Sequence, residues 1–492
     1  MDAPDRLRLR TKLGFGIGAM PEAAAQIAFN TWSFVFYNSV LGLSGTLCGL
    51  AATCAIVLEA VADPAIGAFS DRFRSGLGRR HPFMFAAPLP FVIALYCLYS
   101  PPAALHGFSL FAWLTVFAVL HRQAMSLFYI PYLALGAELS NDYQERSIVM
   151  SYATLFGVIG GAGVFVYGWT HLGHVPGGSA VRSGYPGLAM GIGLFVALAM
   201  LGSARATRDQ IPRLVRAMPA HASRFGLREL GHELRGALSN RNYRMLLIGM
   251  VFFSVVVGVR ETLDSYLSLF FWRLPADKIR AFGLATPPAS ILAFFVTPRL
   301  HSRFGKRNTL VTAVATMIAA AALPIAARLG VFFPSNGSAA LLPTLMLFVF
   351  VAYGALAVIL ITVLSAVADI TDEHELVTGR RQEGLFYSAR ILFGKLTTAF
   401  GHVIAGLSLD LIGFHAGAKP GQVSADVLVK LGLVIILATV IPGIIAMLFY
   451  GRYSITRQRH LEIRRELAAR RAPPVDELPA KPVDTSTPLQ HA

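Results

Sequence analysis

Residues 67–80 have the sequence GAFSDRFRSGLGRR, a charged loop with three glycines that separates two apolar runs. A shorter form of this loop, RFGKR, occupies residues 303–307 in the second half of the chain. A second pair of segments also matches, because AELSND at 137–142 resembles ADITDE at 368–373. Two pairs of matching segments in the same order predict two similar halves, arranged as a parallel repeat.

The composition places both halves in a membrane. Of the 492 residues, 55% are hydrophobic and 14% are charged, whereas soluble domains carry about 25% charged residues. A helix that crosses a bilayer needs about 20 mostly apolar residues. Runs of this kind lie at 14–41, 45–70, 81–100, 108–138, 148–170, 185–204, 243–272, 281–298, 308–328, 339–368, 384–413 and 425–450. We therefore expect an all-α membrane protein with twelve transmembrane helices in two pseudo-symmetric six-helix bundles.

Hydrophilic segments divide the chain into four parts. Residues 1–204 form the expected N-terminal bundle, and residues 243–450 form the C-terminal bundle. Residues 205–242 form a linker on the cytoplasmic side, in which the spacing of apolar residues predicts an amphipathic helix. These apolar residues are Phe225, Leu227, Leu230, Leu234 and Leu238. Residues 451–492 form a tail that begins with a basic helical pattern and ends in a proline-rich stretch, which we expect to be disordered.

The excess of basic residues, 43 Lys and Arg against 27 Asp and Glu, indicates membrane orientation and not nucleic-acid binding. Most of them lie in the N-terminal arm, in the loops after even-numbered runs and in the tail. The positive-inside rule then places both termini in the cytoplasm. The first run lacks a small-residue cleavage site, so we expect an uncleaved multi-pass protein of the inner membrane.

The residue types that enzymes and metal proteins need are not grouped in this sequence. Cys48, Cys54 and Cys97 lie in apolar runs without the spacing of a metal site, and they are interpreted as small buried side chains. The sequence contains no nucleophile–base pair, no metal-ligand cluster and no appended signalling domain. We therefore expect no enzymatic activity, no metal site and no cofactor.

Glu59 and Asp63 are the most informative charges in the apolar runs. They stand four residues apart, so they share one face of a helix, about one turn from each other. Two carboxylates at this distance repel each other, and they need a proton, a metal cation or a basic side chain. We interpret the pair as a coupling-ion site, and a static ion pair between two helices is the alternative.

Lys395, in the eleventh run, is the expected counter-charge, and Thr398 and His402 extend the same helical face. We interpret this stripe as the lining of a cavity. The alternatives are a structural salt bridge for Lys395 and a packed, hydrogen-bonded side chain for His402.

Other charges in the runs are weaker signals. Arg122 is an isolated polar point in the fourth run, and Arg260, Glu261 and Asp264 lie toward the outer end of the seventh. The last three fit outer gating pairs or side chains that reach the headgroups. Arg390 fits an anionic group of the substrate or a helix C-terminus, and Glu22 is a third candidate carboxylate.

The charged loop and its echoes are candidate gates. Asp71 ends the second run, where its charge opposes the helix dipole unless basic residues cover it. We therefore interpret the loop as a breakable latch, with membrane anchoring as the alternative. The gating candidates are Asp71, Arg72, Arg79, Arg80, Glu138, Arg303, Arg307 and Asp369.

Several short motifs resemble one transporter family. They are KLGFGIGA at 12–19, VLGLS at 40–44, EAVADP at 59–64, YIPY at 129–132, and RQEG at 381–384 followed by Lys395. With the loop at 67–80, they resemble the glycoside-pentoside-hexuronide:cation symporters of the major facilitator superfamily, which include the melibiose carriers. The resemblance implies the major facilitator fold, cation-binding carboxylates at Glu59 and Asp63, and an essential lysine at Lys395.

The sequence departs from that family at recognised positions. The resemblance places Ala62 where the family has a cation-selecting asparagine, and Ser126 at the hydroxyl ligand. Loss of an amide oxygen weakens a sodium site, so protons are favoured over sodium as the coupling ion. The galactoside-recognising residues of the family correspond to Tyr129, Leu133, Thr154 and Ala23, which disfavours a galactoside. Eukaryotic lysophospholipid symporters share the acidic pair and the lysine, so a lipid-like cargo stays open.

We therefore expect a monomeric secondary transporter, embedded in the lipid bilayer, that moves a sugar or glycoside with a cation by alternating access. A channel and a membrane-embedded enzyme or sensor are the rivals, and neither has a recognisable filter or catalytic group here. We assign coupling to Glu59, Asp63, Lys395 and Ser126. The candidate substrate-binding residues are Tyr129, Tyr132, Glu22, Asn30, Arg390, Thr398 and His402.

Overall fold

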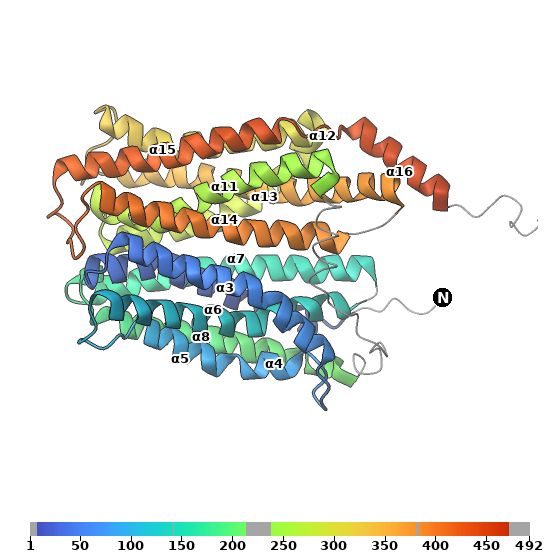
Figure 1. Ribbon diagram of the computed structural model, residues 1–492, viewed down its shortest axis with the longest axis horizontal. Helices are drawn as coiled ribbons and strands as arrows, with labels where there is room; N and C mark the ends of the chain where they lie inside the picture. The colour runs from blue at the N-terminus through green and yellow to red at the C-terminus, as the bar shows by residue number, and fades with distance from the viewer. Residues whose placement is uncertain (1–6, 141, 213–237, 380–382, 472–492) are drawn as a thin grey trace, which may run out of the picture.

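The computed structural model describes residues 7–140, 142–212, 238–379 and 383–471, and these ranges contain helices and turns but no β-strand. The long helices run side by side along the molecule (Figure 1). We call the end that carries α16 (Arg457–Arg471) and the loop at 73–80 the tail end, and the opposite end the far end. The expected all-α architecture is confirmed.

The first half of the bundle contains α1 (Leu9–Ile17), α2 (Met20–Ala28), η1 (Phe29–Ser33), η2 (Phe36–Val40), α3 (Gly45–Arg72), α4 (His81–Ala86), α5 (Pro88–Leu98), α6 (Gly107–Glu138), α7 (Tyr143–His174) and α8 (Gly184–Ala206), with the short turns η3 (Gly178–Ala180) and η4 (Arg208–Gln210). The second half contains α11 (Arg241–Tyr266), η5 (Leu267–Phe271), α12 (Ala276–Leu329), α13 (Leu341–Thr378), α14 (Glu383–Leu411) and α15 (Ala425–Tyr450).

Among the described residues, 10 helical segments are long and apolar enough to cross a membrane, against the twelve apolar runs of the sequence. One difference is the first run, which is broken into α1, α2 and the π-helical turns η1 and η2. Glycines in this run pack directly against other helices: Gly14 faces Ala206, and Gly18 faces Ser203 and Tyr132. Pro21 then restarts the helix at α2. Close packing and proline explain why this segment is not one regular helix.

The other difference is α12, which joins the eighth and ninth runs over 54 residues. A straight helix of this length would extend about 80 Å, more than twice the thickness of the hydrocarbon core. Gly305 leaves the helical region there, with φ of 76° and ψ of 162°, a backbone conformation that glycine adopts without a steric penalty. The chain bends at Gly305, and α12 supplies two of the expected membrane segments.

Among the described residues, the most extensive contacts between the halves join α3 with α14, α7 with α12, and η1 with α11. Toward the far end the backbones approach closely, because Gly45 of α3 faces Gly406 of α14. A Cβ atom on Gly49 would lie 2.6 Å from the carbonyl oxygen of His402. Small residues are therefore required at this contact between the halves.

The buried side chains are packed differently at the two ends. Toward the far end, one hydrophobic cluster crosses from the first half to the second and includes Phe34, Tyr266 and Phe414. Toward the tail end, the core of the second half forms a separate cluster around Phe253, Val363 and other residues. The far end is therefore the more tightly joined end of the bundle.

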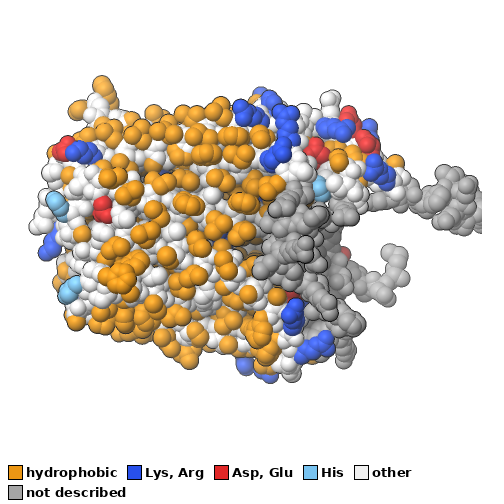
Figure 2. All heavy atoms as spheres, in the orientation of Figure 1, with side chains coloured by type: hydrophobic (Ala, Val, Ile, Leu, Met, Phe, Trp, Pro, Cys, Tyr) orange, Lys and Arg blue, Asp and Glu red, His pale blue; other side chains and the backbone are white. Residues whose placement is uncertain are grey.

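The surface shown in Figure 2 fits a membrane environment. Hydrophobic side chains cover the middle of this face, whereas charged side chains gather at its two ends. Water-exposed apolar side chains on this scale would be unfavourable in solution. The protein is therefore a multi-pass membrane protein.

The linker and the tail are described only in part. The expected amphipathic helix of the linker falls on residues 213–237, outside the described residues, as does the tail beyond Arg471. The basic start of the tail is the helix α16, whose Ile463 and Leu467 pack against Leu376 of α13.

Candidate functional site

Glu59 and Asp63 lie on α3 at the middle of the bundle, where the second half supplies their counter-charge. Lys395 of α14 donates hydrogen bonds to both carboxylates, with Nζ 2.8 Å from Oε1 of Glu59 and 2.6 Å from Oδ2 of Asp63. The spacing of four residues explains this geometry, because one turn of helix presents both carboxylates to the same ammonium group. Lys395 thus links the two halves at this site.

Each carboxylate also has a partner within its own half, on α6. Nη1 of Arg122 lies 2.7 Å from Oε2 of Glu59, and the hydroxyl of Ser126 donates to Oδ1 of Asp63 at 2.6 Å. Arg122 and Ser126 are four residues apart, so α6 repeats the spacing of α3 and the two helices match turn by turn. The site therefore contains two carboxylates, two cations and one hydroxyl group.

The charges in this cluster balance. The ion pair of Arg122 with Glu59 lies within the first half, whereas the contacts of Lys395 cross between the halves. Within its own half, Asp63 has the neutral Ser126 as its polar partner.

The four residues assigned to coupling are thus brought together by the structure. Arg122 was identified in the sequence only as an isolated polar point, and its pairing with Glu59 was missed. Its position four residues before Ser126 was an available signal. No group of three or more His, Cys, Asp or Glu side chains that could hold a metal ion occurs among the described residues.

A cavity of about 510 Å³ lies between the halves, from the middle of the bundle toward the far end. Its walls come from α2, η1 and α7 of the first half and from α11, α12 and α13 of the second. Its aromatic walls include Phe165, Trp169, Trp272, Phe348 and Tyr353. A concave, largely apolar space with a few polar groups is typical of a small-molecule site.

One polar contact across this cavity joins Asn30 to Glu261. Nδ2 of Asn30 donates to Oε2 of Glu261 at 3.0 Å, and the next turn of α11 carries the ion pair of Arg260 with Asp264. His402, buried on α14, has its Nε2 atom 3.9 Å from Oε2 of Glu261. Its Nδ1 atom lies 2.6 Å from the hydroxyl oxygen of Thr262. Glu261 therefore connects the cavity to the α14 face that carries Lys395.

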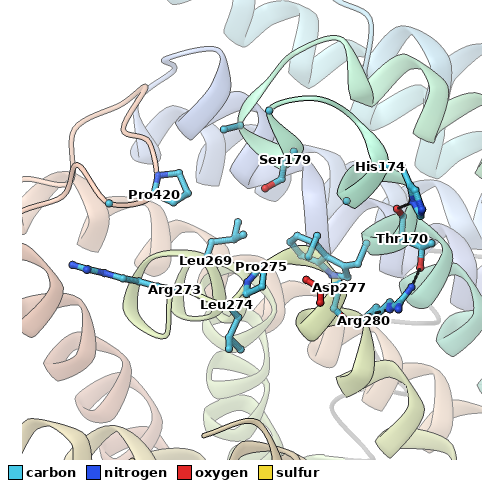
Figure 3. A pocket seen from close by; sticks show the side chains of 17 residues that line it. Thr170, His174, Ser179, Leu269, Arg273, Leu274, Pro275, Asp277, Arg280 and Pro420 are labelled. Atoms are coloured by element: carbon cyan, nitrogen blue, oxygen red, sulfur yellow. Dashed lines mark hydrogen bonds between the residues drawn. The ribbon is translucent and has the colours of Figure 1, made fainter. Parts of the chain in front are cut away.

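A second pocket, of about 650 Å³, opens at the far end (Figure 3). It is lined from both halves: Thr170 and His174 belong to the first half, and Arg273 and Asp277 belong to the second. Trp169, which is fully buried, lines both this pocket and the 510 Å³ cavity. Trp169 thus stands between the far-end pocket and the cavity.

The expected substrate-binding residues separate into distinct groups. Asn30 lines the cavity, and His402 reaches it through Glu261. Glu22 accepts a hydrogen bond from Gln26 at 2.7 Å. Tyr132 is buried and donates its hydroxyl to the carbonyl of Phe15 at 3.0 Å, so its contacts in this structure are those of a packed side chain.

The remaining candidates lie away from the cavity walls. Tyr129 stacks on Tyr132 with 6.0 Å between ring centroids. The backbone carbonyl of Thr398 packs against Gly258. Arg390 lies in the second half, where its Nε atom has no hydrogen-bond partner among the described residues. The sequence could not distinguish these positions, because helical periodicity does not say which neighbouring helix a face meets.

Several of the candidate gates form ion pairs at the tail end, in a separate cluster in each half. Arg80 contacts Asp71 at 2.5 Å and Glu138 at 2.9 Å, and Arg79 contacts Glu138 at 2.8 Å. Arg72 is exposed. All of these contacts lie within the first half, where they join α3, the loop at 73–80 and α6.

In the second half, Asp369 is held by Lys306 at 2.6 Å and by His460 of α16 at 3.3 Å. Arg303 instead lies over the ring of Phe304, and Arg307 contacts Asn308. Lys306 contacts Asp369 as Arg80 contacts Glu138, so Lys306 is the basic residue of the second half that corresponds to Arg80. A match of the sequence letters alone did not identify it.

Residues 14–457 match the model of the family described as MFS/sugar transport protein. The inner membrane symporter YicJ of Escherichia coli (strain K12) is 26% identical, over 94% of this chain and 95% of that protein. The putative glycoside/cation symporter YagG of the same strain is 24% identical, over 99% and 100%.

A relative with a different cargo is the sphingosine-1-phosphate transporter MFSD2B of Mus musculus, 26% identical over 87% of this chain and 86% of that protein. A solved structure, of a bacterial homolog to the human lysosomal transporter Spinster, superposes with a TM-score of 0.64 at 14% identity, over 92% of this chain and 97% of that one. The chain has the major facilitator fold and belongs to the MFS/sugar transport family, as a cation symporter of the glycoside-pentoside-hexuronide type.

Proposed function

We propose that the protein is an inner-membrane symporter that moves a sugar or glycoside together with a cation, and that the cation is a proton. It carries its solute by alternating access and does not convert it. The observation that supports the coupling site most directly is the Lys395 bridge, which ties Glu59 and Asp63 of one half to the other half. Both termini then face the cytoplasm, and the far end faces outward.

In the proposed cycle, protonation of Asp63 removes half of the attraction that holds Lys395. Lys395 then remains paired with Glu59 alone, and Glu59 already has Arg122 as a partner. The contact between the halves weakens, so the loaded carrier reorients. Without a proton, separation of the halves would leave the Asp63 carboxylate without a cation in a low-dielectric site, which is costly.

A proton fits this cluster better than sodium does. Lys395 already lies 2.6–2.8 Å from both carboxylates, so a metal ion would have to displace it. Besides the carboxylate oxygens themselves, the cluster offers the hydroxyl oxygen of Ser126 as a ligand. Hard cations in proteins are bound by several oxygen ligands. A proton needs one oxygen of Asp63.

A lysophospholipid or another amphiphile is the second candidate cargo, because MFSD2B, a transporter named for sphingosine-1-phosphate, is among the relatives. The cavity walls contain many apolar side chains, which an acyl chain could contact. A lipid carrier would accumulate long-chain analogues and ignore sugars. Uptake of both solute classes by the same proteoliposomes separates the two candidates.

Coupling is tested by asking whether a variant loses gradient-driven accumulation of the solute but still exchanges the solute across the bilayer. Purified protein is first screened for binding of sugars, glycosides, uronates and lysolipids, with and without sodium and over a range of pH. We expect Asp63→Asn to abolish gradient-driven accumulation of the solute that binds, by tenfold or more, while equilibrium exchange across the bilayer continues. If Glu59→Gln and Asp63→Asn both leave accumulation intact, the coupling site is assigned wrongly.

A further inference from the structure

The ionisable lining of the 510 Å³ cavity comes from α11. Arg260, Glu261 and Asp264 face it, and Nη2 of Arg260 lies 3.0 Å from Oδ1 of Asp264. Because Arg260 pairs with Asp264, Glu261 has no cation of its own among the described residues that line the cavity. Arg122 of the neighbouring cluster is already paired with Glu59. The cavity therefore has a formal excess of one negative charge.

Among the described residues, the first half contributes no ionisable side chain to this lining. Its residues there include Ala23, Gln26, Asn30 and Thr31. Ala23 packs closely on α7, because a Cβ atom added to Gly161 would lie 3.4 Å from the Cβ atom of Ala23. The acidic groups that can meet a solute in this cavity therefore come from the second half.

Buried polar atoms around the cavity have hydrogen-bonding capacity that the described residues do not use. Nε1 of Trp169 and Oδ1 of Asn30 lack a partner among the described residues, and both residues line the cavity. Nε2 of His402, which lies 3.9 Å from Oε2 of Glu261, also lacks a hydrogen-bond partner among the described residues. Buried polar groups are normally hydrogen-bonded. Oδ1 of Asn30 accepts hydrogen bonds and Nε1 of Trp169 only donates them, so these atoms fit a polar ligand with hydroxyl groups, which do both.

We propose that Glu261 and Asp264 accept hydrogen bonds from the solute and make this cavity select hydroxyl or ammonium donors over solutes that carry a carboxylate or a phosphate. This inference rests on the proposed function, because it assigns the specificity of the same carrier. An anionic group would face an unneutralised carboxylate in a site of low dielectric, which disfavours its binding. A hydroxyl or ammonium group would satisfy that carboxylate.

The charge of the cavity can be measured without knowing the solute. Ser290 of α12 and Ala352 of α13 line the cavity, and each is replaced by cysteine in full-length protein whose Cys48, Cys54 and Cys97 are serine. The introduced cysteine is labelled at low ionic strength with a cationic and, in a separate reaction, an anionic methanethiosulfonate of similar size. The ratio of the two rates, corrected for a free thiol in solution, reports the local potential.

We expect the cationic reagent to react faster, and each unit of charge to change the ratio about three- to tenfold. Arg260→Gln should raise the preference, Glu261→Gln or Asp264→Asn should remove most of it, and the double variant Glu261→Gln/Asp264→Asn should reverse it. The control Asp426→Asn, which removes an exposed carboxylate on α15, should leave the ratio unchanged. Any one cavity variant that is monodisperse is sufficient for the comparison.

An unchanged ratio in the Glu261 and Asp264 variants, or an anionic reagent that reacts faster with the otherwise unaltered protein, overturns the proposal. The second measurement compares binding of 4-nitrophenyl glucoside, glucosaminide and glucuronide, which share one aglycone. We expect the glucuronide to bind at least tenfold more weakly than the glucoside, and Glu261→Gln to narrow that gap. A glucuronide that binds the unaltered protein as tightly as the glucoside contradicts the inference, and the labelling ratio decides where none of the three binds.

Failure of the proposed function gives a different pattern. If coupling does not depend on Asp63, the Asp63→Asn variant accumulates solute, yet the labelling ratio still follows the charge of α11. If the cavity does not select by charge, the ratio of the two labelling rates is the same in all α11 variants, whereas Asp63→Asn still abolishes accumulation of the solute. The two outcomes are independent.

Discussion

At the scale of single residues, the central cluster divides its ion pairs between permanent and breakable contacts. Glu59 and Arg122 belong to one half, at 2.7 Å, whereas Lys395 reaches across from the other half. A buried carboxylate that loses its partner is destabilised, and one that retains its partner is not. This division is the reason that Asp63, and not Glu59, carries the switchable charge in our account.

Arg122→Gln tests the permanent pair. The Glu59 carboxylate is 7% exposed, and without Arg122 it keeps only Lys395, which it shares with Asp63, so Arg122→Gln should lower the free energy of unfolding by about 3 kcal/mol. Glu59→Gln/Arg122→Gln should lose much less than the sum of the two single variants, because the carboxylate that Arg122 neutralised is gone as well. Thermal unfolding of the purified proteins measures the difference, and additive losses would show that the pair is not coupled.

The sequence predicted part of this cluster. A spacing of four residues placed Glu59 and Asp63 on one face, and an intramembrane lysine required an acidic partner, so the contact with Lys395 was foreseeable. Arg122 was not assigned, since an isolated charge in a helix does not indicate which neighbour it meets. The position of Tyr132 was not foreseen for a similar reason: its ring packs on Phe15, with 4.4 Å between centroids, and it is not among the residues that line the cavity.

At the scale of helices, the far-end contact between α3 and α14 has its own stabilising groups. Asp410 of α14 accepts hydrogen bonds from the backbone N–H groups of Gly45 and Thr46, at 2.9 and 2.8 Å. A carboxylate at a helix N-terminus is favoured by the free N–H groups and by the helix dipole. The opposing pair Gly45 and Gly406 allows the close approach.

Gly406→Val tests whether this contact closes the far end. Its side chain would collide with the backbone of Gly45, so we expect the far end to stay apart and transport to fall at least tenfold. Cys48 of α3, now 2% exposed, should become reactive toward a water-soluble thiol reagent in protein that retains it as the single cysteine.

The matched control is Gly202→Val on α8, where a Cβ atom would meet nothing within 4 Å. It should leave Cys48 protected and transport unchanged. If Gly406→Val also leaves Cys48 protected, the glycine contact does not hold the far end closed.

Helix boundaries were predicted well where a run is uniformly apolar, and poorly where packing against other helices determines where a helix breaks. The sequence placed α6 and α15 within a few residues, because hydropathy changes sharply at their ends. It did not foresee the breaks in the first segment, where Gly14 and Gly18 meet other helices. Such contacts depend on partners distant in the chain, which hydropathy does not report.

At the scale of the whole molecule, the halves are joined by one hydrophobic cluster toward the far end and by the Lys395 bridge at the centre. The hydrophobic core of the second half toward the tail end is separate. This distribution is expected of a carrier that is closed at the far end and can open at the tail end. The repeat of 67–80 at 303–307 made the two halves predictable, whereas the state of the carrier was not, because both states share one sequence.

Proton coupling is tested most directly by measuring the ion that moves with the solute. Proteoliposomes that hold a pH-sensitive dye receive an inward gradient of the solute identified by the binding screen, with no ion gradient imposed. We expect solute entry to acidify the lumen in the unaltered protein. In vesicles preloaded with unlabelled solute, Asp63→Asn should still take up labelled solute by exchange and move no protons. Solute entry with no proton movement in the unaltered protein, or proton movement that persists in Asp63→Asn, contradicts proton coupling through Asp63.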